Sequence, residues 1–117
     1  MRQFLNHVVY DPASVPDEMV KERQERATEA DTAEFMPLRV GNMAPIEELW
    51  RERLDRVQHE TLIIWGREDR MNPIDQGMIL MRQIPKARLL VMPQCGHWPQ
   101  WEKADEFNRA VAAFLES

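Results

Sequence analysis

Two short apolar runs, each followed by an amphipathic stretch, constrain the fold of this chain most strongly. The first run covers residues 61–65 and ends at Gly66, and the second covers residues 88–92 and ends at Pro93. Continuous β-rich runs of this length are typical of strands that are buried on both faces of a parallel sheet. The order strand, helix, strand, helix therefore predicts an α/β fold built on a parallel βαβα unit with a right-handed crossover.

The two helices of this unit are indicated by proline placement and by the spacing of apolar residues. Asn72 is expected to cap the first helix and Pro73 to occupy its first position. The inner face of this helix is expected to hold Ile74, Met78 and Met81. The second helix has its apolar positions at Ala104, Phe107, Val111, Phe114 and Leu115.

The part of the chain before residue 59 contains helical patterns separated by prolines. Apolar spacing predicts a helix within residues 1–10, and a second helix is expected from Pro16 to about Ala30, with Ser14 as its N-cap. Arg23 lies on the apolar stripe of that second helix. Its guanidinium either extends to solvent along its methylene groups or points into a cavity to meet an anion, and the pattern alone favours the first interpretation.

Polar residues follow each expected strand at the edge where an open α/β sheet binds its ligand. Asp69 comes four residues after the first strand, and His97 comes five residues after the second. Because both loops leave the same edge, a hydrogen bond between the two side chains is geometrically reasonable. Such a carboxylate would fix the tautomer of the imidazole. Two alternatives remain open, namely a surface carboxylate paired with Arg67 or Arg70, and an ordinary turn histidine.

Composition argues against several classes of partner. A net charge of −5 and a pI near 5.2 disfavour nucleic acid, and no apolar run is long enough to span a membrane. The first residues lack the apolar core of a signal peptide, and Cys95 is the single cysteine, so we expect a cytoplasmic protein without an internal disulfide. No cluster of histidines, cysteines and acids has metal-ligand spacing, so no metal site is expected. Cys95 is expected to be a buried structural thiol.

Two segments of the sequence resemble parts of a known enzyme superfamily. TLIIWGREDRMNP is similar to the strand and acid loop of α/β-hydrolases, and QCGHWPQWEKADEFNRAVAAFL is similar to their histidine loop and last helix. The GHW-x-Q-x-E-x-x-x-EFN form resembles the meta-cleavage product hydrolases, which cleave carbon–carbon bonds in bacterial breakdown of aromatic compounds and steroids. The resemblance implies the C-terminal portion of an α/β-hydrolase, with a helical lid at residues 1–58 and part of the core at residues 59–117.

The same resemblance implies roles for particular residues. Asp69 would be the acid and His97 the base of a Ser-His-Asp triad. Arg23 would bind the carboxylate of a small dienoate substrate, while Trp98 and Met71 would line the pocket, although packing alone explains Trp98 equally well. The family reaction is ketonisation of a dienol followed by hydrolytic carbon–carbon cleavage, which gives a 2-hydroxy-dienoate and a carboxylic acid. It needs no cofactor.

The nucleophile of such a triad does not occur in these 117 residues. The only serines are Ser14 and Ser117, and neither lies in a G-x-S-x-G turn. We therefore expect a fragment, a truncated product or part of a split protein, which forms a homo-oligomer or associates with a missing N-terminal part and has no hydrolase activity alone. The alternatives are another α/β-hydrolase of the esterase or dehalogenase type, and a non-catalytic remnant that binds a protein.

Overall fold

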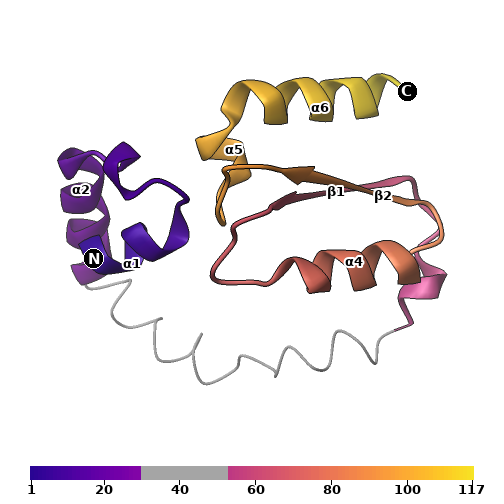
Figure 1. The fold of residues 1–117 in the computed structure, drawn as a ribbon, viewed down its shortest axis with the longest axis horizontal. Coiled ribbons are helices and arrows are strands. Elements are labelled where there is room, and N and C mark those ends of the chain that lie inside the picture. The colour runs from indigo at the N-terminus through magenta and orange to yellow at the C-terminus, as the bar shows by residue number, and fades with distance from the viewer. Residues whose placement is uncertain (30–52) are drawn as a thin grey trace.

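A computed structural model describes residues 1–29 and 53–117 of the chain, and Figure 1 shows its fold. The described elements are, in order, α1 (Arg2–Val8), η1 (Pro12–Ser14), α2 (Asp17–Thr28), η3 (Leu54–Arg56), β1 (Thr61–Gly66), α4 (Ile74–Gln83), β2 (Ala87–Met92), α5 (Pro99–Glu102) and α6 (Ala104–Glu116). None of the helices in these two ranges combines the length and the apolarity that crossing a bilayer requires. The division into a lid up to residue 58 and a core from residue 59 stays a prediction.

The two strands form a parallel sheet, with Thr61 opposite Ala87 at one end and Gly66 opposite Met92 at the other. The α4 helix covers one face of this sheet and α6 covers the other (Figure 1). This is the expected α/β arrangement with a βαβα unit. However, residues 61–65 are only half-buried, so the complete burial expected for these strands is wrong for this chain. A single helix on each face leaves part of the apolar surface of two strands uncovered.

The α4 helix begins one residue later than its proline predicts. Pro73 is the N-cap rather than the first helical residue, and the side chain of Asn72 does not cap the helix. The inner face also differs, because Met78 is 38% exposed while Gly77 is buried. The Trp65 indole packs against Gly77 so closely that an added Cβ would lie 3.1 Å from its Cε3 atom. The indole occupies the space beside α4 in which the apolar spacing predicted side chains of the helix.

The N-terminal helices have a small core of their own. Its buried members are Leu5, Val8, Val9 and Val15, against which Met19, Val20 and Trp98 pack. Helices are present where apolar spacing predicts them, but Pro16 is the N-cap of α2, so the prediction of Ser14 at that position is wrong. The Ser14 hydroxyl instead donates to the carbonyl of Asp11 within η1. Ala30 lies outside the described residues.

The α1 helix and the segment after it lie beyond the carboxyl ends of the strands (Figure 1). The His97 N–H donates to the Val8 carbonyl at 2.8 Å. The Arg70 guanidinium donates to the carbonyls of Val9 and Asn6 at 3.2 and 3.3 Å. The N-terminal segment therefore contacts both loops that carry the predicted site. It accepts hydrogen bonds from the main chain of His97 in one loop and from the side chain of Arg70 in the other.

Candidate active site

The Asp69 carboxylate lies in the turn after β1 and has three hydrogen-bond donors. Its Oδ1 atom accepts from the main-chain N–H groups of Met71 and Asn72 at 2.8 and 3.0 Å. Its Oδ2 atom lies 2.8 Å from Nδ1 of His97. The side chain is only 5% exposed. An ionised carboxylate only accepts hydrogen bonds, so three donors around an enclosed group match its chemistry.

The histidine loop turns sharply after β2 and packs against the N-terminal segment. Gln94 adopts a left-handed φ of 52° at the start of the turn. At Gly96 a Cβ would lie 2.4 Å from the Val8 carbonyl oxygen and 2.9 Å from the Tyr10 nitrogen. Only glycine fits between these two main chains. The following residue, His97, is held by its N–H bond to the same Val8 carbonyl.

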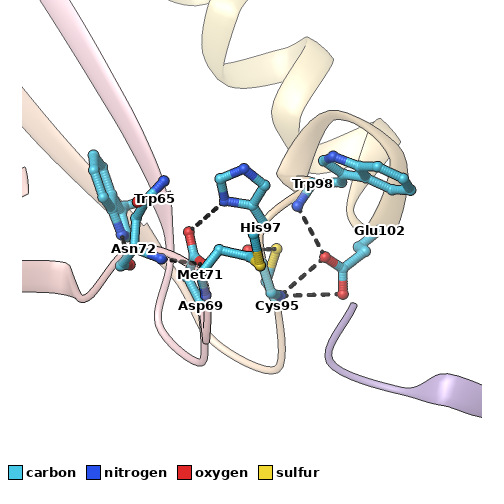
Figure 2. Close-up of polar contacts among 9 residues, drawn as sticks. Trp65, Asp69, Met71, Asn72, Cys95, His97, Trp98 and Glu102 are labelled. Atoms are coloured by element: carbon cyan, nitrogen blue, oxygen red, sulfur yellow. Dashed lines mark hydrogen bonds and ion pairs between the residues drawn. The ribbon is translucent and has the colours of Figure 1, made fainter. Parts of the chain in front are cut away.

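The Asp–His hydrogen bond expected from the strand ends is present, although the two residues are 28 positions apart. Because Nδ1 of His97 faces a carboxylate, it carries the hydrogen and Nε2 is left with a free lone pair. Figure 2 shows the second ring nitrogen directed away from Asp69. The His97 side chain is 33% exposed. Both residues line one cavity of about 300 Å³, whose walls include Ile64, Trp65 and Phe107.

The neighbouring arginines do not supply the alternative partner for Asp69. Arg67 pairs with Glu68 at 2.7 Å, and Arg70 donates to main-chain carbonyls of the N-terminal segment. The carboxylate of Asp69 is thus committed to His97 and to its own turn. The arrangement can fix one imidazole tautomer and balance a positive charge that develops on the ring.

Arg23 and Trp98 are brought together, but outside the cavity of Asp69 and His97. The Arg23 guanidinium carbon lies 4.5 Å from the centroid of the Trp98 ring, a cation–π contact. Arg23 is exposed and lines a separate hollow of about 410 Å³ with Met1 and Phe4. Arg23 is not among the residues that line the cavity beside His97. The packing of Trp98 under Arg23 gives this aromatic a structural function in its own right.

Met71 is 41% exposed and is not among the residues that line the cavity. Its contribution to the described site is its main-chain N–H, which donates to Asp69. Asn72 contributes in the same way, and its carbonyl also accepts from the Trp65 indole at 3.1 Å. These two residues shape the acid loop through their backbones, which residue type alone does not reveal.

The sequence pattern predicted no role for two glutamates that lie at the site. Glu68 accepts from the Cys95 N–H at 3.1 Å and from Arg67 at 2.8 Å. Burial raises the pKa of Glu68, but the bonds from Cys95 and Arg67 outweigh it, so its pKa is lowered. Glu102 accepts from three main-chain N–H groups. Its position in the GHW-x-Q-x-E pattern was the only signal available for it.

The Cys95 thiol is expected to be unreactive at neutral pH. It is fully buried, and burial together with the Glu102 charge raises its pKa from 9.0 to about 12. Its thiolate fraction at pH 7 is then about a thousandfold lower than that of an unfolded chain. Labelling with a chromogenic disulfide reagent should be slow in the native chain and fast in urea. Similar rates in both states would show that the thiol is accessible and ionisable.

The raised pKa of Cys95 also makes the stability of the folded chain depend on pH. The folded state holds the Cys95 proton more tightly, so this contribution is complete below pH 9 and is lost as the pH rises towards about 12. At neutral pH the group is a neutral thiol, as expected for a structural cysteine. A thiolate nucleophile activated by His97 is not compatible with these properties.

The parallel βαβα unit and the Asp–His pair at its strand ends define a class of protein. The sequence profile described as "alpha/beta hydrolase fold" matches residues 10–104, and the chain belongs to this family. It is 37% identical over 98% of its length to a 2-hydroxy-6-oxo-6-phenylhexa-2,4-dienoate hydrolase of Comamonas testosteroni, and covers 41% of that protein. A 2-hydroxy-6-oxononadienedioate/2-hydroxy-6-oxononatrienedioate hydrolase of the same species is 35% identical over the same shares.

Solved structures give the same result. The meta-cleavage product hydrolase CumD from Pseudomonas fluorescens IP01 matches 99% of this chain with a TM-score of 0.84 and 32% identity. The chain covers 44% of that structure. The expected resemblance to the C-terminal part of meta-cleavage product hydrolases is therefore confirmed. The chain spans about two fifths of the length of the curated relatives that it matches.

Proposed function

We propose that this chain supplies the acid and the base of a Ser-His-Asp hydrolase that cleaves a carbon–carbon bond in meta-cleavage products. The observation that carries the proposal is the 2.8 Å contact between Asp69 Oδ2 and His97 Nδ1 at the edge of an apolar cavity. It leaves the Nε2 lone pair of His97 available for a proton. The relatives named above, which are called dienoate hydrolases, support the choice of reaction.

In the proposed mechanism, proton transfer is the contribution of this chain. Nε2 of His97 accepts a proton from the nucleophile or from water, and Asp69 balances the charge on the imidazolium. The same nitrogen then returns the proton to the carbon fragment that leaves. The serine and the oxyanion-hole donors would come from residues outside these 117, either in the same reading frame or in an associated nucleophile-bearing part.

Arg23 is the proposed anchor for the carboxylate of the substrate. Its guanidinium is exposed and lies over Trp98, the residue next to His97. A planar guanidinium can bind a carboxylate with two parallel hydrogen bonds. The cation–π contact with the indole holds the guanidinium in place, and none of the described residues accepts a hydrogen bond from it.

The test uses the genomic reading frame around this chain. We expect an in-frame G-x-S-x-G upstream, and we expect the protein expressed from the whole frame to cleave 2-hydroxy-6-oxo-6-phenylhexa-2,4-dienoate. The matched assay uses p-nitrophenyl esters with the same preparation. Cleavage of esters without cleavage of the dienoate would favour an esterase instead. A frame without a nucleophile, together with an inactive product, would favour a non-catalytic binding role.

A further inference from the structure

We propose that Glu102 is a positioning residue that holds the histidine loop in the orientation that pairs His97 with Asp69. The catalytic value of this role rests on the proposed function, but the positioning itself can be measured without turnover. Glu102 is the last residue of α5, the short helix directly after the loop. Its half-buried carboxylate turns back towards the loop (Figure 2).

The Glu102 carboxylate accepts from three main-chain donors on two segments. Its oxygens lie 3.0 and 3.1 Å from the Gly96 nitrogen, and Oε1 lies 3.1 Å from the Trp98 nitrogen. Oε2 lies 2.7 Å from the nitrogen of Tyr10, in the N-terminal segment. One side chain therefore connects the residue before His97, the residue after it and the segment that packs against them.

The four consecutive N–H groups of the histidine loop all have acceptors. Cys95 donates to Glu68, Gly96 and Trp98 donate to Glu102, and His97 donates to the Val8 carbonyl. Three of these four donors thus face carboxylates, and charge-assisted hydrogen bonds are stronger than neutral ones. With the peptides on both sides of His97 fixed, the direction of its Cα–Cβ bond towards Asp69 is fixed as well.

Neutral glutamine cannot reproduce this arrangement. A carboxylate offers two oxygens that accept only, whereas an amide offers one oxygen and one NH₂ group that only donates. With donors on both oxygens, Glu102→Gln must turn its NH₂ group towards either the Tyr10 N–H or the loop N–H groups. At least one of these donors loses its acceptor and the others face a neutral oxygen in place of a charged one, so the loop is held less tightly.

The experiment uses the 117-residue chain and NMR. In the unmodified chain, the hydrogen on Nδ1 of His97 should give a downfield signal, because it is bonded to an enclosed carboxylate. In Glu102→Gln we expect this signal to broaden or disappear. We also expect the amides of Gly96, Trp98 and Tyr10 to exchange at least about tenfold faster, while the β1–β2 amides keep their rates.

The matched control is Glu106→Gln, which removes the same charge from an exposed position in the first turn of α6. It should leave the His97 signal and the three exchange rates unchanged. A general loss of stability would speed exchange in the β-strands as well, so local and global effects are separated. An unchanged His97 signal in a folded Glu102→Gln chain would overturn the proposal.

Hydrogen exchange in the unmodified chain keeps the proposal testable if the variant does not fold. Slow exchange at Gly96, Trp98 and Tyr10 is the expected result, and exchange at the rate of free peptides would overturn the positioning role. Absence of the Nδ1–H signal from the unmodified chain would also overturn it, because the Asp–His pair itself would then be absent. If the protein expressed from the whole frame does not cleave the dienoate, the proposed function is contradicted but the positioning role of Glu102 is not.

Discussion

Asp69→Asn is expected to lower kcat of the proposed complete hydrolase by about 10⁴-fold, the scale known for an aspartate-to-asparagine substitution in a serine protease triad. The reason follows from the contacts of the two carboxylate oxygens. Oδ1 is held by the N–H groups of Met71 and Asn72, so the asparagine oxygen must take that place. Its NH₂ group then faces Nδ1 of His97, which becomes an acceptor. The hydrogen moves to Nε2, and the tautomer needed to accept the nucleophile's proton is lost.

The tautomer can be read independently of activity. Nitrogen chemical shifts of His97 in the 117-residue chain should report hydrogen on Nδ1 in the unmodified protein and on Nε2 in Asp69→Asn. His59→Ala, at an exposed position before β1, is the control and should retain full activity and the native tautomer. A loss of less than tenfold in Asp69→Asn would contradict the assignment of Asp69 as the triad acid.

The pairing of Asp69 with His97 could be predicted from the sequence because it depends on topology. Two parallel strands end at one edge, so residues that follow both ends lie near each other whatever the details of the loops. The apolar runs were sufficient to place β1 and β2 within one residue. The same reasoning placed the helices, since 3.6-residue periodicity survives errors of a residue or two at their ends.

The contacts that shape the loops could not be predicted in this way. Glu102, Glu68 and the Val8 carbonyl act on main-chain N–H groups, which every residue has, so residue type carries little information about them. Helix caps failed for a related reason. The main-chain N–H of Asn72 donates to Asp69 and its carbonyl accepts from Trp65. The conformation of this acid turn depends in turn on the position of the histidine loop. Tertiary packing determines these loop contacts and helix caps, and a local sequence pattern carries no information about that packing.

Gly66→Ala is expected to destabilise the chain by about 3 kcal/mol, at the upper end for inserting a methyl group into a packed site. A Cβ at Gly66 would lie 1.9 Å from the Gly96 carbonyl oxygen and 2.6 Å from that of Cys95. The obstructing atoms belong to the main chain, so no side-chain rotation can remove the overlap. Urea unfolding followed by circular dichroism would measure the change in the free energy of unfolding.

Gly66→Ala should disrupt the Asp–His pair even where it leaves the chain folded. To make room for the methyl group, the acid loop must move away from the histidine loop. That movement breaks the bond from the Glu68 N–H to the Cys95 carbonyl, now 3.0 Å long, which joins the two loops beside Asp69 and His97. The Nδ1–H signal of His97 should therefore be lost in Gly66→Ala even under conditions where the chain remains folded.

Gly77→Ala gives the matched control, because the same methyl group there meets a side chain instead of a backbone. Its Cβ would lie 3.1 Å from the Trp65 ring, which can yield by a few tenths of an ångström. Alanine in place of glycine inside α4 favours the helix by about 1 kcal/mol, which offsets the tighter contact. We expect a net change within about 1 kcal/mol and an intact His97 signal. Equal effects of the two substitutions would mean that the close approach of the two loops is not what positions the Asp–His pair.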